Sequence, residues 1–445
     1  MAQPIRRESP PKGSWLLGNL PELQKDWLGT LRRWKELYGD FVTVRLGPRP
    51  VVFIFDPADA EAVLVHNYKH FRKNFIIRRT RFVIGDGLLL SEGDFWLRQR
   101  RLMQPAFHRQ QIALYAATMS ELTNQALNSW QDGATVDMHR EMTLLTRSIV
   151  SRCLFGTDVE DHAGAIEKAV DRLMNNFSAL TNSATLIPLL LPTRKNLQFR
   201  RYKQQLDDLV YRFIEQRRKD APNSNDLMSV LLRARDDAGS GMTDKQLRDE
   251  VLTLFLAGHE TTASALTWAI YFLTQHPEAA HKMAEEVDAV LNGRAPTADD
   301  VPRLKYTESV FKEAMRLYPP SWLIGRETVT PCEIRGRKIP KGWNLFICPW
   351  VIHRDARWFP EPDTFRPERW LEPHIESLPR GAYLPFGAGP RQCIGNHFAM
   401  TEAVIILASI AQRFELQRNV DEPVIPVPLV SIRPQGGLPV TVSRR

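Results

Sequence analysis

The sequence has few cysteines and no uninterrupted apolar run of the length that a membrane span needs. Its 445 residues include only four cysteines and no C-x-x-C pair, which argues against a zinc ribbon and against a disulfide framework. Each cysteine is therefore expected to be a free thiol. The most apolar stretch, residues 251–273, carries His259 and Glu260 near its centre, so a buried core helix is the better interpretation.

The sequence also lacks the patterns of a signal peptide and of a nucleic-acid-binding region. The N-terminal stretch "MAQPIRRESPPKGSWLLGNLPEL" lacks the apolar core of a signal peptide, so we expect a cytoplasmic protein without a membrane span. The net charge is +8, but there is no basic tail and no nucleic-acid-binding motif. A solvated basic face or an acidic protein partner is expected, and nucleic acid is not.

The pattern along the chain is mainly helical with a minor β portion. Short apolar runs bounded by Gly and Pro predict strands at about 38–56 and 320–350. Most of residues 57–277 and residues 397–413 have helical periodicity. Because no repeat and no long polar linker occurs, we expect one α-rich domain over residues 1–445, with residues 1–10 flexible.

Two helices have informative sequences. Thr243 followed by Gln246 is a capping-box pattern, and no proline occurs until Pro277. This predicts a helix of about thirty residues, roughly 50 Å long, interrupted by the polar "AGHETT" at 257–262. In a second helix, at about 303–318, Glu313 and Arg316 share a face, which alone indicates no more than a surface ion pair.

The stretch "FGAGPRQCIG", residues 386–395, surrounds one cysteine with glycines. Gly387 and Gly389 permit backbone angles and close approaches that a side chain forbids, and Gly395 leaves room for a flat group. The helix that follows favours an anionic sulfur on Cys393. Arg391 can pair with an anionic group of the same ligand.

A planar, carboxylate-bearing ligand that contains iron meets these demands, and that ligand is haem held by the Cys393 thiolate. Zinc needs further ligands that the neighbourhood does not supply. A Rossmann phosphate loop is excluded because Gln392 occupies the third glycine position.

The same stretch matches the F-x-x-G-x-R-x-C-x-G signature and therefore resembles the cytochrome P-450 family. The matching positions are Phe386, Gly389, Arg391, Cys393 and Gly395. Further resemblances follow in the family's order: "WLRQR" (96–100), "AGHETT" (257–262), "EAMR" (313–316) and "PERW" (367–370). Trp370 stands where phenylalanine is usual, and we expect it to pack in the same way.

This resemblance implies a single large triangular fold with a long central helix crossing over haem b. It implies a haem-thiolate monooxygenase that inserts one atom of O₂ into an apolar organic substrate. Electrons would come from a separate ferredoxin- or flavodoxin-type donor with its reductase, and the enzyme is expected to be a monomer. A fatty acid or a terpenoid-like molecule is the expected substrate.

The resemblance also assigns roles to single residues. Cys393 becomes the axial iron ligand, and Phe386 and Gly387 belong to the loop that holds the cofactor. Glu260 and Thr261 become the acid–alcohol pair that delivers protons. The expected partners of the haem propionates are Trp96, Arg100, Arg326 and Arg391, with Lys73 as a further candidate. Glu313, Arg316 and Arg369 resemble the family's buried charge triad.

Two other functions remain open. A haem-thiolate isomerase or peroxygenase works without a reductase, although the Glu260–Thr261 pair argues against it. A non-catalytic haem-binding sensor is the second. The expected pocket walls are mainly aliphatic and aromatic: residues 75–90, 186–192, the helix before 257, and 322–324.

Overall fold

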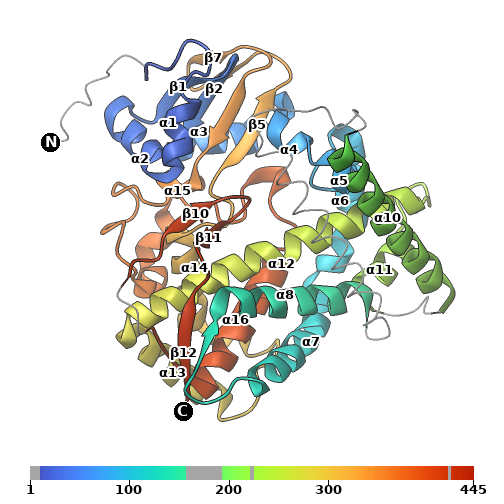
Figure 1. The fold of residues 1–445 in the computed structure, drawn as a ribbon, viewed down its shortest axis with the longest axis vertical. Coiled ribbons are helices and arrows are strands. Elements are labelled where there is room, and N and C mark those ends of the chain that lie inside the picture. Colours follow the sequence, from blue (N-terminus) through green and yellow to red (C-terminus); the bar gives the residue numbers. More distant parts are fainter. Residues whose placement is uncertain (1–10, 157–192, 221–224, 419–421) are drawn as a thin grey trace. The chain divides into compact units, whose positions relative to one another are not determined.

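The computed structural model describes residues 11–156, 193–220, 225–418 and 422–445, and Figure 1 shows the chain. Residues 1–10 and the expected pocket wall at 186–192 lie outside the described residues. The chain divides into two compact units. The first unit comprises residues 1–77, 119–146 and 258–445, and the second comprises 78–118 and 147–257.

A five-stranded sheet in the first unit has the strand order β1-β2-β8-β5-β3, and Figure 1 labels its strands β1, β2 and β5. Its strands are β1 Phe41–Leu46, β2 Arg49–Ile54, β8 Asn344–Ile347, β5 Ile324–Thr328 and β3 Phe71–Lys73. Only β2 and β8 pair in parallel; the other neighbours are antiparallel. Strands β1, β2, β8 and β5 lie within the two segments for which the sequence predicts β structure, at about 38–56 and 320–350, whereas β3 lies outside both.

The sheet is buried on both faces because β2 carries apolar residues at successive positions. Val51 and Phe53 belong to one core cluster, which also contains Trp34 and Trp268. Val52 and Ile54 belong to a second cluster on the opposite face, as the alternation of side chains along a strand requires.

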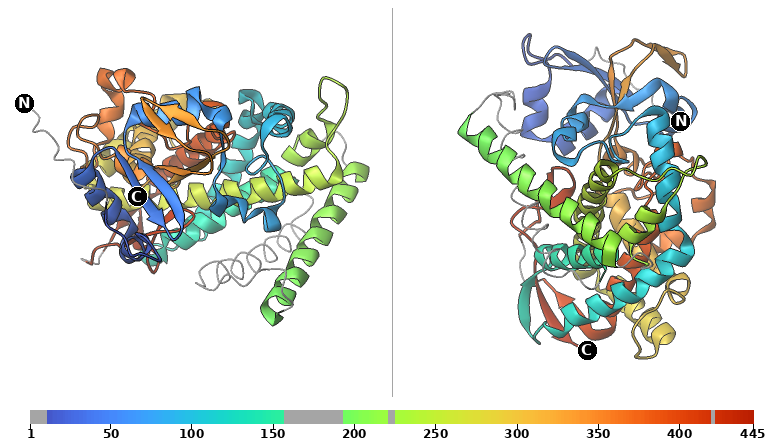
Figure 2. Two further views of the ribbon diagram at one scale, coloured as in Figure 1. Left: turned by 90° about the horizontal axis from the view of Figure 1, so that it is seen from above. Right: turned by 90° about the vertical axis from the view of Figure 1, so that its right-hand side faces the viewer.

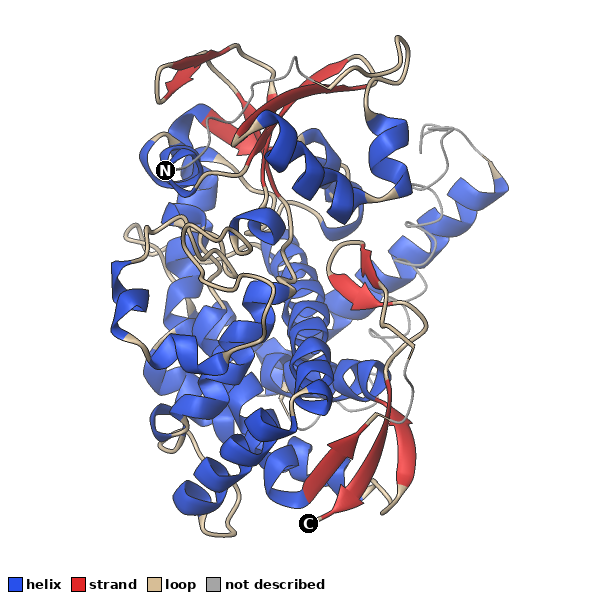
Figure 3. Ribbon diagram, turned by 90° about the vertical axis from the view of Figure 1, so that its left-hand side faces the viewer, coloured by secondary structure: helices blue, strands red, loops and turns tan. Residues whose placement is uncertain are grey.

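Three smaller sheets complete the β structure of the first unit (Figure 3). They are β4-β12-β9, the pair β6-β7 and the hairpin β10-β11. The bounds of these strands are β4 Ala134–Asp137, β12 Pro439–Arg444, β9 Phe414–Gln417, β6 Cys332–Ile334, β7 Arg337–Ile339, β10 Pro426–Pro428 and β11 Ile432–Pro434.

The remaining structure is helical. Helices within the first unit are α1 Leu20–Lys25, α2 Trp27–Tyr38, α3 Pro57–Glu61, α13 Pro277–Leu291, α14 Lys305–Leu317, α15 Pro349–Ile352 and α16 Asn396–Arg413, together with the π-helical turn η1 Ala62–His66. Within the second unit lie α5 Arg81–Ile84, α6 Gly93–Met103, α10 Arg194–Asp220 and α11 Leu227–Arg233. Figure 2 shows α10 as one continuous helix. The predicted mainly α fold with a minor β portion is confirmed.

Four helices contribute residues to both units: α4 Phe75–Arg78, α7 Arg109–Asn128, α8 Met138–Phe155 and α12 Asp244–Gln275. The predicted capping box of α12 is confirmed. The Thr243 amide donates to Gln246 Oε1 (2.8 Å) and the Gln246 amide donates to Thr243 Oγ1 (3.2 Å). The helix is 32 residues long, close to the predicted thirty. Among the described helices, none is long and apolar enough to cross a membrane.

Candidate functional site

The cysteine-bearing segment is a closed loop. The Cys393 amide donates to the Phe386 carbonyl (3.0 Å), and the Gly387 amide donates to the Leu384 carbonyl (3.1 Å). Gly389 has φ +70°, and a Cβ there would lie 2.1 Å from the Leu64 carbonyl oxygen. Only glycine permits this close approach, which packs the cysteine loop against η1.

Cys393 differs from the other cysteines in its exposure. All four cysteines are described, and Cys393 is exposed, whereas Cys153 and Cys348 are buried and Cys332 is half-buried. Burial raises the pKa of the Cys348 thiol to about 12 and also raises the pKa of Cys332. Cys393 is therefore the thiol that the fold presents to a ligand.

A group of cations faces the same side of the sheet as this loop. A Cβ on Gly387 would meet only Ile324 Cδ1, at 4.0 Å, so β5 begins beside the loop. Arg326 follows Ile324 by two positions and shares its face. Lys73 on β3 lies directly opposite Arg326 in the strand register. The two cations therefore share one face of the sheet with Ile324, beside the cysteine loop.

These residues fit haem. The exposed Cys393 sulfur can bind iron, the missing side chain at Gly387 leaves space for a flat ring, and the Lys73–Arg326 pair suits a carboxylate. Among the described residues, no group of three or more His, Cys, Asp and Glu side chains could hold a metal ion instead. The lack of a C-x-x-C pair excludes covalent attachment of the c type.

The predicted charge triad is buried, so the interpretation as a surface ion pair is wrong. Glu313 Oε1 accepts from Arg316 Nη2 and from Arg369 Nε, each at 2.8 Å, and all three side chains have 0% exposure. The Glu313 carboxylate thus pairs with both buried guanidinium groups, whose remaining donors bind backbone carbonyls such as those of His353 and Pro360.

Trp370 does more than pack, contrary to the expectation from sequence. Its indole Nε1 donates to Glu313 Oε2 (2.9 Å), a bond that phenylalanine cannot make. Trp370 is therefore one of the hydrogen-bond donors to the buried Glu313 carboxylate.

A chain of hydrogen bonds connects this triad to the cysteine loop. Arg316 Nη1 donates to the His353 carbonyl (2.8 Å), and His353 Nε2 accepts from the Leu384 amide (2.8 Å). Burial and the nearby arginines lower the pKa of His353 to about 3, so the imidazole is a neutral acceptor. Leu384 in turn accepts from Gly387, and the triad thus supports the loop at its first turn.

The polar residues that interrupt α12, His259 to Thr262, lie in the first unit. Glu260 and Thr261 are half-buried, whereas His259 and residues 262–270 are buried and Ala257 is exposed. Ser431 Oγ donates to Glu260 Oε1 (3.0 Å). The neighbouring Thr262 Oγ1 donates to the Gly258 carbonyl (3.2 Å), one turn earlier in α12.

Sequence reasoning missed two acidic residues. Glu402 on α16 is completely buried, and burial raises its pKa well above the usual range, with the nearby Thr262 hydroxyl offsetting only part of this effect. Glu250 on α12, in the second unit, accepts from the Leu88 amide (2.9 Å) and from Gln99 Nε2 (3.0 Å). Its burial raises its pKa to about 8. Glu402 precedes an apolar run, which is a weak signal, whereas Glu250 follows Arg248 and Asp249 and carries no such signal.

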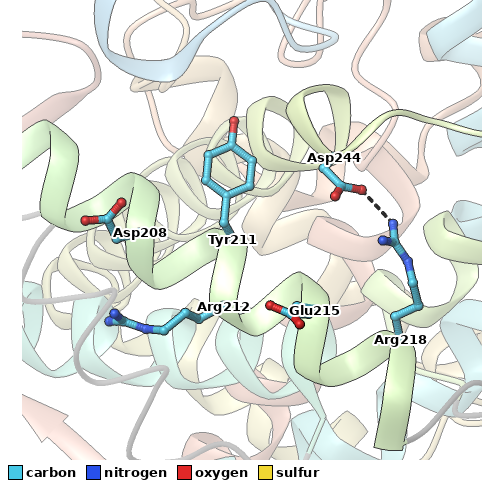
Figure 4. A pocket seen from close by; sticks show the side chains of 6 residues that line it. All are labelled: Asp208, Tyr211, Arg212, Glu215, Arg218 and Asp244. Atoms are coloured by element: carbon cyan, nitrogen blue, oxygen red, sulfur yellow. Dashed lines mark hydrogen bonds and ion pairs between the residues drawn. The ribbon is translucent and has the colours of Figure 1, made fainter.

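Trp96 and Arg100 lie on α6 in the second unit, four positions apart on one face. Trp96 is buried and Arg100 is half-buried. Their part in holding haem stays a prediction. The hollow drawn in Figure 4 also belongs to this unit and lies between α10 and the start of α12. Its six lining residues are all exposed, and five of them carry charge, so it does not suit an apolar substrate.

An exposed thiol on a glycine-rich loop, with cations on the neighbouring sheet face and an acid–alcohol pair in a long apolar helix, defines a haem-thiolate protein of the oxygen-activating class. Comparison with known proteins agrees with this class. The family model described as Cytochrome P450 matches residues 9–439, and the chain belongs to that family.

Several curated relatives are similar over most of their length. Cyclooctatin synthase of Streptomyces melanosporofaciens is 40% identical over 91% of this chain and 87% of that protein. Cyclooctat-9-en-7-ol 5-monooxygenase of the same species is 35% identical, covering 93% and 92%. Pentalenene oxygenase of Streptomyces avermitilis is 34% identical, covering 89% and 88%.

A solved structure gives the same fold. The crystal structure of cytochrome P450DA heme domain aligns with a TM-score of 0.88 at 26% identity, covering 98% of this chain and 97% of that one. The chain is therefore a haem-thiolate monooxygenase with haem b as its cofactor. It inserts one atom of O₂ into an apolar organic substrate, using electrons from redox partners.

Proposed function

We propose that this chain oxygenates a terpenoid-like substrate at the face of a haem that Cys393 ligates. The exposed Cys393 thiol beside Gly387 and the Lys73–Arg326 pair is the observation that supports this site. The names of the three relatives refer to cyclooctatin, cyclooctat-9-en-7-ol and pentalenene, which favours a terpenoid-like substrate over a fatty acid.

The residues around the cofactor divide into a ligand, a loop and a set of donors. Cys393 binds iron, and Phe386 and Gly387 shape the loop at its side. Arg326 and Arg391 in the first unit, with Trp96 and Arg100 in the second, donate to the propionates. A thiolate-ligated haem supplies the cleavage of the O–O bond when it is bound. We further propose that both units form a single haem domain over residues 1–445.

Glu260 and Thr261 supply protons from α12. A carboxyl group and a hydroxyl group in an apolar helix cost free energy unless they are hydrogen-bonded. Ser431 provides this partner for Glu260. Thr261 passes protons on the substrate side, while Glu260 exchanges them with solvent through its half-exposed side chain.

The electron donor is proposed to be an acidic protein of the ferredoxin or flavodoxin type, working with its reductase on a monomeric cytoplasmic enzyme. Arg98 and Arg101, both on α6, are two candidates for the docking face. Arg98 Nε donates to Asp236 Oδ2 (2.6 Å), which neutralises much of its charge. Arg101 lies 3.9 Å from Asp237, and both of these side chains are exposed. Arg101 is therefore the better candidate, and reduction should slow as salt rises.

The test is turnover with a terpenoid library and a ferredoxin–reductase pair under O₂. Displacement of the resting-state water by a ligand, seen as a spectral shift, identifies binders before turnover. Oxygenated product that depends on the reductase supports the proposal. Product formed only with peroxide would favour a peroxygenase, and binding without product would favour a haem sensor.

A further inference from the structure

We infer that Ser431 is a positioning residue for proton delivery, because it holds the Glu260 carboxylate on one side of α12. Ser431 lies in the turn of the β10–β11 hairpin and is completely buried. The inference rests on the proposed role of Glu260 in the function above. It adds a residue far along the chain to the machinery that supplies protons.

The hairpin docks on one face of α12 at three successive positions. Glu260, Ser264 and Trp268 are four residues apart and therefore share a face of the helix. Ser264 Oγ and Trp268 Nε1 both donate to the Ile432 carbonyl, each at 2.8 Å. Ser431, the preceding residue, donates to Glu260 Oε1 at 3.0 Å. Glu260 is therefore the first of three residues along one face of α12 that contact the β10–β11 hairpin.

The direction of the hydrogen bond between Ser431 and Glu260 follows from the number of hydroxyl hydrogens available. A serine hydroxyl has a single hydrogen to donate. Ser264 gives its hydrogen to the Ile432 carbonyl at 2.8 Å, and the Ser431 oxygen lies farther away, at 3.3 Å. Ser431 therefore keeps its own hydrogen for the carboxylate, which only accepts when it is ionised.

This contact decides where the acid points. Adjacent residues of an α-helix are about 100° apart around the axis, so Glu260 and Thr261 do not face the same direction. Ser431 holds the carboxylate on the hairpin side of the helix, away from the side of Thr261. Without this bond, the flexible glutamate chain can adopt other rotamers, and its proton is no longer presented from a fixed position.

The Ser431 hydroxyl is not needed to keep the hairpin in place. Trp268 and Ser264 bind Ile432, and Trp322 Nε1 donates to the Leu429 carbonyl (2.9 Å). Three anchors therefore remain when Ser431 loses its hydroxyl. A loss of function in such a variant reports on Glu260 and not on a displaced hairpin.

The experiment compares Ser431→Ala with the matched control Trp268→Phe, which removes one hairpin anchor but leaves Glu260 untouched. Ser431→Thr keeps the hydroxyl and should behave as wild type. In the holoenzyme, S431A should lower product per electron consumed about three- to tenfold, the scale of a lost positioned hydrogen bond. The substrate dissociation constant should change less than about twofold, and W268F should keep its coupling.

A double-mutant cycle separates positioning from structure. In the Glu260→Gln background, S431A should cause no further loss of product per electron. The infrared carboxylate band that is absent in E260Q should shift in S431A and stay in place in W268F, without turnover. An equal S431A effect with and without Glu260, or an equal effect in W268F, would overturn the inference. If E260Q alone keeps wild-type coupling, the proposed role of Glu260 fails, and the infrared shift still decides whether Ser431 positions it.

Discussion

Lys73 and Arg326 lie directly opposite each other on the adjacent strands β3 and β5. The neighbouring pair, Arg72 and Glu327, lies on the other face of the sheet and forms an ion pair at 2.6 Å. The face that carries Lys73 and Arg326 also carries Ile324, which lies beside the cysteine loop. Such a pair is arranged for an anionic ligand.

Replacing Arg326 by Gln should matter more for haem retention than for the stability of the haem-free protein. In the haem-free protein it removes one of two cations that lie directly opposite each other, and the free energy of unfolding should change by no more than about 1 kcal/mol. In the holoenzyme it removes a propionate partner, so haem should transfer to apomyoglobin faster. Urea unfolding and haem-transfer rates measure the two effects. The control Arg72→Gln loses its ion pair and should not gain stability in either state.

Alanine substitutions at Gly389 and Gly387 should affect the protein differently: the first should disturb the fold, and the second should mainly reduce haem content. At Gly389 a Cβ would lie 2.1 Å from the Leu64 carbonyl oxygen, so G389A should disturb the loop and the fold of the haem-free protein. At Gly387 the nearest atom is Ile324 Cδ1, at 4.0 Å. G387A should therefore cost only about 1–2 kcal/mol for its positive φ but reduce haem content strongly. Thermal unfolding without haem and the pyridine haemochrome assay would separate them; equal haem content in G387A and wild type contradicts the proposed site.

Trp370→Phe should destabilise the protein by about 1.5–3 kcal/mol, the range for a hydrogen bond to a buried charge. The Glu313 carboxylate is completely buried and loses one of its donors. Trp130→Phe is a matched control, because the Trp130 indole donates to the part-buried Glu141 (3.1 Å), and about 0.5–1.5 kcal/mol is expected there. Denaturant unfolding of both variants tests the difference, and an equal cost would contradict a special role for Trp370.

Glu250 should make stability depend on pH. Burial raises its pKa from 4.5 to about 8 in the folded protein, so between these values the folded state keeps a proton that the unfolded state releases. Its contribution is fully present below about pH 4.5 and is lost as pH rises through about 8, at most about 1.4 kcal/mol per pH unit.

Glu250→Gln, which keeps an acceptor for Leu88, should flatten this slope between pH 5 and 8. Glu215→Gln is a suitable control, because Glu215 is fully exposed and its bond to Lys219 lowers its pKa. Unfolding curves at several pH values provide the measurement. An unchanged slope in E250Q would show that Glu250 is ionised in the folded protein.

The sequence predicts the local features whose signals are short-range. The Thr243–Gln246 capping box and the length of α12 follow from cap and proline spacing. Glycines around Cys393 indicate the loop, because their backbone angles are a local requirement. The resemblance to the family adds the pairing of Glu313 with Arg369, 56 residues later, which no local pattern indicates.

The contacts that the sequence does not reveal join distant segments. Ser431 is 171 residues from Glu260, and an isolated serine in a turn carries no periodic signal. The register that sets Lys73 against Arg326 depends on the pairing of β3 with β5, which tertiary packing decides. Glu250 and Glu402 look like ordinary helix acids until their burial is known.

The most direct measurement is the absorption spectrum of the ferrous–CO complex of the purified holoenzyme and of two cysteine variants. Ligation by the Cys393 thiolate predicts a red-shifted Soret band in the wild type, its loss in Cys393→Ser, and its retention in Cys332→Ser, where a half-buried thiol is replaced. A red-shifted band that survives in Cys393→Ser, or a folded and colourless protein after expression with ample haem, would contradict this ligation.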